Sequence, residues 1–178
     1  NSLRIGFIFV LIGFGTKMGL APMHNWLPDA HSEAPSPISA LLSGTLLNCA
    51  LLGILRFYQI CVAAGLSAFA ERLLLIFGLI SLFISAVFIS YQKDFKRMLA
   101  YSSIEHMGII ALAVGIGADF AAMLHVVGHS LTKTLLFLVA GNILILYKSK
   151  MVSDVNGLLR TSAPTGILLV IGGLAIVG

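Results

Sequence analysis

The feature that most constrains this chain is a series of apolar stretches long enough to cross a bilayer. The stretch from Ala68 to Ser90 carries no charged residue after Arg72, and about 20 apolar residues in a helix span the hydrocarbon core. Of the 178 residues, 58% are hydrophobic and only 10% are charged, whereas soluble domains carry about 25% charged residues. The stretches are also far longer than the alternating strands of a membrane barrel. The sequence therefore predicts an all-α, polytopic membrane protein.

The boundaries between these stretches predict about five full transmembrane helices and a truncated sixth, in a single transmembrane domain that covers residues 1–178. The expected helices are Leu3–Leu20, Ile38–Ala63, Ala68–Ser90, Lys93 or Lys96 to Gly117, Phe120–Tyr147 and a last one from Thr165. The chain starts with Asn1 rather than methionine, and its last stretch, residues 165–178, is shorter than the ~20 residues needed to span. We therefore expect an internal piece of a longer protein.

The segment 17–37 predicts a broken helix. Lys17 stands at the end of an apolar stretch, and an uncompensated lysine near the centre of a membrane helix costs roughly 2.5–3.5 kcal/mol. The prolines that follow are Pro22, Pro28, Pro35 and Pro37. They free backbone groups that lipid cannot satisfy. A break beside a buried charge is typical of ion pathways; the alternative is a lysine that reaches the headgroups next to an ordinary loop.

The charges between the helices predict the orientation. One side carries Lys93, Lys96, Arg97, Lys148, Lys150 and Arg160, and the other carries Arg4, Arg56 and Arg72. Positively charged loops tend to stay in the cytoplasm. Residues 21–37, 91–97 and 147–162 are therefore expected on the cytoplasmic side of the cell (inner) membrane.

Several predicted helices bring a polar side chain to mid-membrane depth, about ten residues or more from either helix end. These residues are Asn48, Glu105, His106 and Lys133. His125 and His129 precede Lys133 on the same helix, and the three follow one another at i, i+4 and i+8, which places them on one face. Each is costly alone in a membrane, but together they can hydrate and pair one another. Because histidine readily exchanges protons near neutral pH, this pattern predicts a proton relay along the bilayer plane.

Other interpretations of the polar residues stay open. His125 and His129 have the spacing of a metal pair, but no cysteine or carboxylate lies within a turn and Lys133 would repel a cation, so we expect no metal and no cofactor. His125 could also simply donate a hydrogen bond to a neighbouring helix. His24 and His31 are expected to be capping or entrance residues of the broken segment. Trp26 suits an interfacial anchor, and Gly108, Gly115 and Gly128 suit contacts between helices.

Three blocks of the sequence resemble a known family. They are TKMGLAPMHNWLPDAHSEAPSPISALLSGTLLNCALLGILRFY, DFKRMLAYSSIEHMG and HVVGHSLTKTLLFLVAG, which span most of residues 10–145. The blocks resemble the proton-conducting antiporter-like subunits of respiratory complex I, Mrp-type antiporters and group 4 membrane-bound nickel–iron hydrogenases. The wording SEAPSPISALLSG followed by LLNCALLGILRFY is most similar to the hydrogenase-4 component F type.

The resemblance implies roles for particular residues. Lys17 matches the central protonatable lysine of the family's broken seventh helix, and His106 matches the histidine of the tenth. His129 and Lys133 match the histidine and lysine of the eleventh helix, and His125 lies a turn earlier, as in some members. The implied topology, with the seventh helix starting outside, agrees with the charge count.

The sequence also departs from the family pattern. Asn48 stands where several complex I relatives have a lysine in the eighth helix; because asparagine cannot be protonated, a relay there must pass through water or take another path. The glutamate that pairs with the lysine matching Lys17 would precede Asn1, and the charged residue of the twelfth helix would follow Gly178. The piece alone therefore lacks both ends of the expected channel.

The resemblance implies a proton-translocating membrane subunit of a redox-driven complex, of the hydrogenase-4 or formate-hydrogenlyase kind. No redox ligand set is visible, so electron transfer is expected in partners: other membrane subunits and a peripheral, hydrogenase-like redox arm. A net charge of +4 is too small to indicate nucleic-acid binding. The alternatives are a complex I-type antiporter-like subunit, an Mrp-type cation/proton antiporter that uses Glu105, and a structural membrane scaffold for partner subunits.

Overall fold

The computed structural model describes residues 2–177, and these residues form helices and no β-strand. The α-helices are α1 (Ser2–Met18), α2 (Trp26–Glu33), α3 (Ser36–Leu41), α4 (Leu47–Ala63), α5 (Ser67–Tyr91), α6 (Phe95–Gly115), α7 (Asp119–Tyr147), α8 (Leu158–Thr161) and α9 (Ala163–Val177). A π-helical turn, η1 (Leu42–Leu46), joins α3 to α4, and a 3₁₀ turn, η2 (Val152–Asp154), follows α7.

Four helical segments are long and apolar enough to cross a membrane: 36–63, 67–91, 95–115 and 119–147. Helix α1 has 17 residues, the lower limit for a span, and α9 is a shorter apolar helix of 15 residues. These segments confirm the predicted all-α, polytopic membrane fold.

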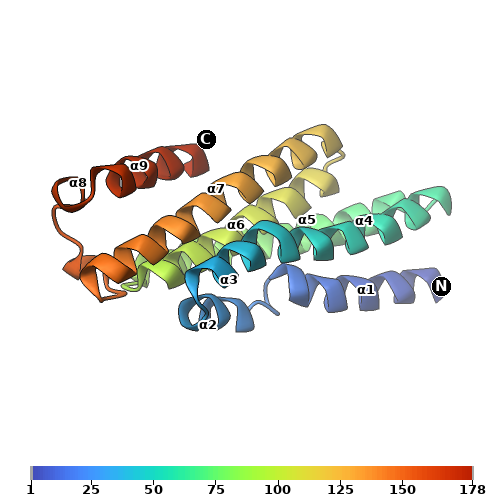
Figure 1. Ribbon diagram of the computed structural model, residues 1–178. Coiled ribbons are helices and arrows are strands. Elements are labelled where there is room, and N and C mark those ends of the chain that lie inside the picture. Colours follow the sequence, from blue (N-terminus) through green and yellow to red (C-terminus); the bar gives the residue numbers. More distant parts are fainter. Residues whose placement is uncertain (1, 178) are drawn as a thin grey trace.

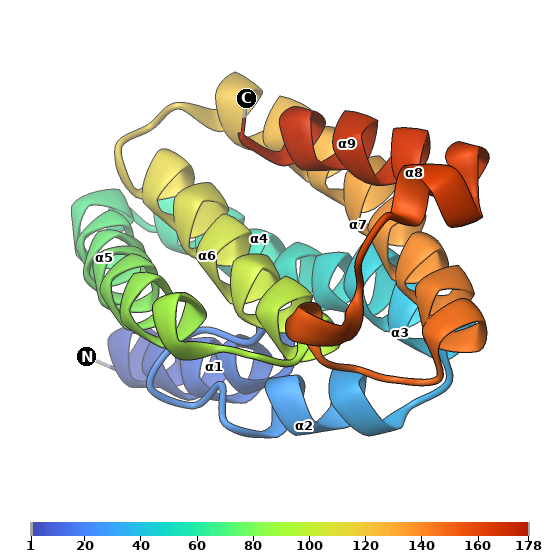
Figure 2. The same cartoon turned by 90° about the vertical axis from the view of Figure 1, so that its left-hand side faces the viewer.

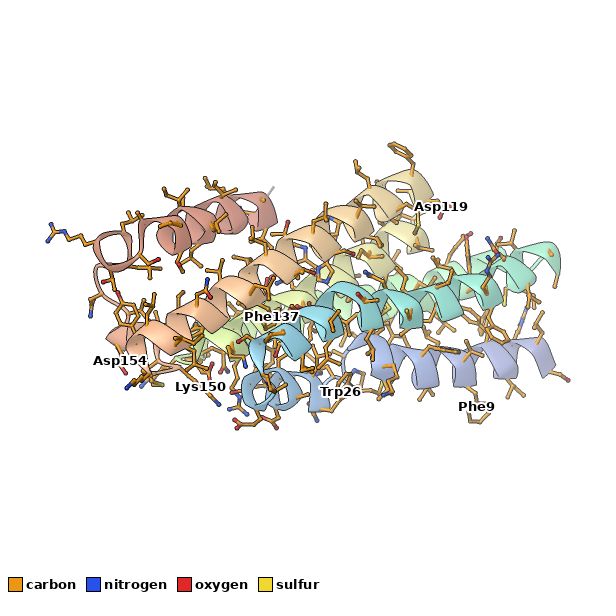
Figure 3. The ribbon with its side chains drawn as sticks, viewed as in Figure 1. Phe9, Trp26, Asp119, Phe137, Lys150 and Asp154 are labelled. Atoms are coloured by element: carbon orange, nitrogen blue, oxygen red, sulfur yellow. The ribbon has the colours of Figure 1, made fainter. Side chains whose placement is uncertain are left out.

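The long helices lie side by side and alternate in direction along the chain (Figure 1). Helices α5 and α6 form the most extensive pair; α1 packs on α4, and α7 packs on α3, α6 and α9. Large apolar side chains cover the outside, as Phe9 does where it points away from α1 with 69% of its surface exposed (Figure 3). Such a surface suits contact with lipid or with further helices rather than water.

The predicted break in the first transmembrane segment is confirmed. Gly19, with φ of 85°, closes α1 because this left-handed conformation lets the Leu20 N–H bond to the Gly15 carbonyl at 2.9 Å. The chain resumes as α2 at Trp26, whose indole N–H donates to the Thr16 carbonyl at 2.7 Å. Trp26, which the sequence suggested as an interfacial anchor, thus gives a second hydrogen bond to a carbonyl in the last turn of α1, which also accepts from the Gly19 N–H at 3.2 Å.

The broken segment folds into the bundle. His24 and His31, expected as capping or entrance residues, are both buried, and neither caps a helix, so the capping part of the prediction is wrong. The entrance part stays a prediction. The ring of His24 packs edge-on against Phe88 and Tyr101. The Ala21 N–H in the same segment donates to the buried Ser81 hydroxyl at 2.9 Å. Protein groups therefore satisfy part of the backbone that the break exposes, as a membrane interior requires.

Glycines allow α5 and α6 to approach closely. A Cβ atom on Gly78 would lie 2.8 Å from the Gly108 carbonyl oxygen, and one on Gly115 would lie 2.8 Å from the Leu75 nitrogen. The predicted packing roles of Gly108 and Gly115 are thus confirmed. The same prediction for Gly128 is wrong, because an added Cβ there would meet no atom within 4 Å; this glycine lies on an open face of α7.

We predict that Gly78→Ala destabilises the helix bundle by ~1–3 kcal/mol, the usual cost of overpacking, because the new methyl group would press against backbone atoms of α6. Gly128→Ala is the matched control: it has open space and gains helix propensity. Thermal unfolding of the purified protein in detergent measures both. An unchanged midpoint for Gly78→Ala would show that the two helices can separate without cost.

Candidate functional site

Polar residues occupy the middle of three neighbouring helical segments. Lys133 lies fourteen residues from either end of α7, and Glu105 lies ten residues from either end of α6. Asn48 lies near the centre of the segment 36–63. Because α7 contacts both α6 and the η1 turn before α4, the three midpoints are on adjacent helices. The predicted mid-membrane depth of these residues is therefore matched by their positions in the helices.

Three histidines from α6 and α7 form a cluster. The His106 Nδ1 and His125 Nε2 atoms are 2.8 Å apart, within hydrogen-bonding distance, and the two rings stack with centroids 5.0 Å apart. The ring of His129 lies 5.5 Å from that of His106. In the pair, the N–H of one imidazole donates the hydrogen bond and the unprotonated nitrogen of the other accepts it. A change of tautomer in both rings therefore exchanges donor and acceptor. The predicted hydrogen bond between His125 and a neighbouring helix is confirmed.

Lys133 lies one turn beyond His129 on α7 and has no exposed surface. Its ammonium group donates a hydrogen bond to the Leu99 carbonyl of α6 at 3.2 Å. Within residues 2–177 it has no carboxylate in salt-bridge contact. A lysine at this depth is expensive for a membrane protein to keep, and Lys133 with the histidine cluster forms a line of exchangeable groups along α7.

Asn48, from the segment 36–63, contacts α7 beside this line of residues. Its side-chain nitrogen donates to the Ser130 hydroxyl at 2.6 Å and to the Gly44 carbonyl at 2.8 Å. Ser130 is the sequence neighbour of His129, so Asn48 is held beside the cluster. The Ser43 and Ser103 hydroxyls bond to each other at 2.9 Å in the same region.

The π-helical turn η1 was not foreseen from the sequence. It lies at the residues Leu42–Leu46, directly before Asn48 and against α7. Turns of this type are rare and are frequent at functional sites, because they add a residue to the helix and shift the side chains that follow. The run Ser43, Gly44 and Thr45 is the available signal, since small and polar residues weaken the regular helical pattern.

Among the described residues, no hydrogen bond joins Lys17 or Glu105 to the histidine cluster or to Lys133. The Lys17 side chain is exposed in this chain, and its ammonium group lies 5.6 Å from the ring centre of Trp26. Glu105 makes no salt bridge with the residues described. It lines, with His106, a cavity of about 600 Å³ bounded by α5, α6, α7 and α9. The structure therefore joins His106, His125, His129, Lys133 and Asn48, but not Lys17.

A second polar group, which we term the clasp, holds the broken segment to the start of α6. Its residues are Ser32, Ala34, Asp94 and Lys96. The Asp94 carboxylate caps α6, accepting from the Lys96 and Arg97 backbone N–H groups at 2.8 and 3.1 Å, and it also accepts from the Ser32 hydroxyl at 2.9 Å. The clasp lies at the end of the bundle that faces the viewer in Figure 2, near the α5–α6 turn.

Lys96 is buried rather than exposed in a loop. The charge count placed it among the loop charges, yet only 1% of its surface is exposed. Its ammonium group donates to the Ser32 and Ala34 carbonyls at 3.3 and 2.5 Å. These carbonyls belong to the C-terminal end of α2, where a positive charge is favourable. The lysine is folded beneath a helix end, which counting loop charges cannot reveal.

Ion pairs reinforce the clasp on its exposed side. Arg97 pairs with Asp29 of α2, and the Lys150 ammonium group lies 3.2 Å from the Glu33 carboxylate. Lys150 and Asp154 mark this end of α7 in Figure 3, and Asp119 marks the other. Exposed pairs of this kind contribute roughly 0–1 kcal/mol each, so the buried clasp residues carry more of the attachment.

The described residues contain no group of three or more His, Cys, Asp or Glu side chains placed as metal ligands would be. The whole chain, residues 1–178, matches the model of the NADH:quinone oxidoreductase/Mrp antiporter transmembrane family. The chain belongs to this family. It is therefore an antiporter-like, integral membrane protein.

Relatives of the antiporter-like family support the predicted type. The chain is 50% identical to the hydrogenase-4 component F homolog of Methylacidiphilum infernorum over 100% of its own length and 38% of the relative's. It is 35% identical to hydrogenase-4 component B of Escherichia coli, over 96% of the chain and 28% of that protein. The predicted resemblance to the hydrogenase-4 component F type is confirmed. The chain spans less than two fifths of the length of these relatives.

Solved structures share the fold. A chain of the archaeal membrane-bound sulfane sulfur reductase superposes with a TM-score of 0.87 at 28% identity, over 97% of this chain and 36% of that one. A chain of respiratory complex I from Thermus thermophilus gives 0.77 at 26% identity, over 97% and 38%. The Mrp complex from Dietzia has the same fold, with a TM-score of 0.91 at 20% identity, over 98% and 33%.

We predict that Asp94→Ala lowers the stability of the protein by ~0.5–2 kcal/mol, because it removes the cap of α6 together with the bond from Ser32. Asp154→Ala removes the same charge elsewhere and is the control. Hydrogen bonds from Ser149 and Ser153 hold the pKa of the Asp154 carboxyl below its ordinary value, so it is also charged at neutral pH, but its contacts are local. Thermal unfolding in detergent compares the two; equal midpoints would contradict the role given to the clasp.

Proposed function

We propose that this chain forms the middle section of a proton-translocating membrane subunit in a redox-driven complex of the hydrogenase-4 or formate-hydrogenlyase type. The observation that carries the proposal is the line of exchangeable side chains at mid-membrane depth. It runs from the His106–His125 hydrogen bond through His129 to the buried Lys133. An apolar membrane bundle has no packing need for four such groups on two facing helices, since each is costly to bury.

The line has the chemistry that proton transfer requires. Each imidazole can accept a proton on one nitrogen and release one from the other. Lys133, held by a neutral carbonyl rather than by a carboxylate, can change its charge without breaking an ion pair. Asn48 cannot be protonated, and its bonds to Ser130 and Gly44 suit it to orient water beside the cluster.

Lys17 is proposed as the central switch of the full-length subunit, on the strength of its match to the family's broken helix. Its side chain is exposed in this chain and reaches Trp26, so a carboxylate from another part of the protein could approach it. An ion pair on Lys17 would then form and break as that carboxylate approaches and withdraws. The relay residues would respond to the change.

The proposed setting is the cell (inner) membrane, with other membrane subunits and a peripheral redox arm as partners. Relatives include hydrogenase-4 components and chain 4 of NAD(P)H-quinone oxidoreductases, and the structural neighbours come from respiratory or Mrp complexes. Residues 21–37, 91–97 and 147–162 are proposed to face the cytoplasm. Their gathering at one end of the bundle (Figure 2) supports a shared side.

We predict that Lys133→Met abolishes proton pumping by the complete complex, because the line along α7 loses its only charged member. Lys148→Ala, which removes an exposed lysine just after α7, is the matched control and should pump normally. The measurement is proton uptake by inverted vesicles, with assembly of the complex verified. Unchanged pumping in Lys133→Met would contradict the relay and favour a structural scaffold, which tolerates such substitutions.

We predict the same loss for Lys17→Ala in the full-length protein. The complex should still assemble, because this side chain makes no buried contact in the bundle. If the vesicles pump at the wild-type ratio of protons to electrons, Lys17 is not the switch.

A second candidate function is cation/proton antiport of the Mrp type. The observation that favours it is Glu105, a carboxylate at the midpoint of α6 that lines the cavity of about 600 Å³. Carboxylate oxygens suit hard cations such as sodium. Antiport predicts sodium-dependent proton movement that Glu105→Gln abolishes; proton pumping that is indifferent to sodium and to Glu105→Gln would exclude it.

A further inference from the structure

We propose that His31 is a proton-carrying site that connects the line along α7 with the clasp end of the bundle. This inference rests on the function proposed above and names a residue that the family resemblance did not assign. It starts from an unusual form of burial. His31 has no exposed surface, and neither of its ring nitrogens has a protein partner among the described residues. Leaving a buried polar group unpaired costs roughly 1–3 kcal/mol, so an imidazole here is a poor choice for packing alone.

The position of His31 relative to α7 is the second observation. Its ring stacks on Phe137 with centroids 4.6 Å apart and planes 15° from parallel. Phe137 lies one helical turn after Lys133, on the same face of α7. Figure 3 shows Phe137 on the side of α7 next to α3, close to where the broken segment ends. His31 therefore lies beside the α7 line, one turn from its lysine.

The position relative to α6 is the third observation. Lys96 donates to the carbonyl of Ser32, the residue that follows His31. Lys133 donates to the carbonyl of Leu99, three residues after Lys96. The Leu99 carbonyl that holds the Lys133 ammonium group is therefore less than one turn along α6 from the backbone of Lys96, about 4.5 Å of helix rise. His31 is linked to Lys96 through its neighbour Ser32 and to the helix turn after Lys133 through Phe137.

The chemistry of the step is a simple proton transfer. An N–H bond of the Lys133 ammonium breaks and one forms on a His31 ring nitrogen. The N–H bond on the opposite ring nitrogen then breaks, and its proton goes to Lys96 when that side chain is a neutral amine. Two neighbouring positive charges disfavour a third beside them, so His31 holds the proton only when a lysine has given up its charge.

His24 is the natural comparison. It lies in the same broken segment and is also buried, but its ring packs against Phe88 of α5 and Tyr101 of α6. No lysine bonds to a neighbour of His24 in the described residues. The two histidines thus share burial and residue type and differ in the charged groups beside them.

The test is the number of protons pumped per electron transferred, in inverted vesicles that hold the complete complex. Four variants are compared: His31→Gln, His31→Phe, His24→Gln and Lys133→Met. His31→Phe keeps a ring to stack on Phe137, and His31→Gln keeps hydrogen-bonding capacity, so neither leaves a large cavity. We expect both His31 variants to assemble and to lose pumping, while His24→Gln pumps as the wild type does.

The outcomes separate the two proposals. Loss in Lys133→Met with normal pumping in either His31 variant would overturn this inference and leave the proposed function standing. Normal pumping in all four would overturn the proposed function itself. Failure of both His31 variants to assemble, with His24→Gln assembled, would make His31 a structural residue and would also overturn the inference. If His24→Gln loses as much pumping as the His31 variants do, the effect belongs to the broken segment as a whole, and the specific role of His31 is overturned.

Discussion

The structure depends on one constraint: backbone N–H and C=O groups inside a membrane bundle must be satisfied by protein or by water in a cavity, because lipid offers them no hydrogen-bond partner. The broken segment after α1 shows how this is met. The Trp26 indole bonds to the Thr16 carbonyl at the end of α1, and the Ser81 hydroxyl accepts from the Ala21 N–H. At the C-terminal end of α2, the Lys96 ammonium group donates hydrogen bonds to the Ser32 and Ala34 carbonyls. The broken segment is therefore an ordered part of the fold, held by hydrogen bonds to α5 and α6.

This dependence explains why α5 and α6 are packed so tightly. Gly78 and Gly108 let the two helices pack backbone against backbone, and each helix contributes a group that satisfies the break. If α6 moved, Asp94 and Lys96 would both lose their partners on α2. The glycine contact thus supports the polar contacts, although the two lie on different parts of the helices.

Much of the fold could be predicted from the sequence, because uncharged stretches of about 20 residues allow few alternatives in a membrane. The break was also predictable, from Lys17 and the prolines after it. The i, i+4, i+8 spacing placed His125, His129 and Lys133 on one face, and the structure agrees. Burial of Lys96 and His31 was not predictable. Both follow from how the broken segment turns back into the bundle, which is a tertiary contact and has no periodicity in the sequence.

Helix α2 connects two sites that the sequence treats separately. Its first residue, Trp26, lies under the Lys17 ammonium group, and His31, five residues later, stacks beside the turn that carries Lys133. Helix α2 therefore contacts both lysine-bearing helices, α1 through the Lys17–Trp26 contact and α7 through the stack of His31 on Phe137. The two contacts lie five residues apart on α2, about 7.5 Å of helix rise. Because the break places this short helix between α1 and α7, residues on one element lie beside both of the lysine positions that the sequence singled out.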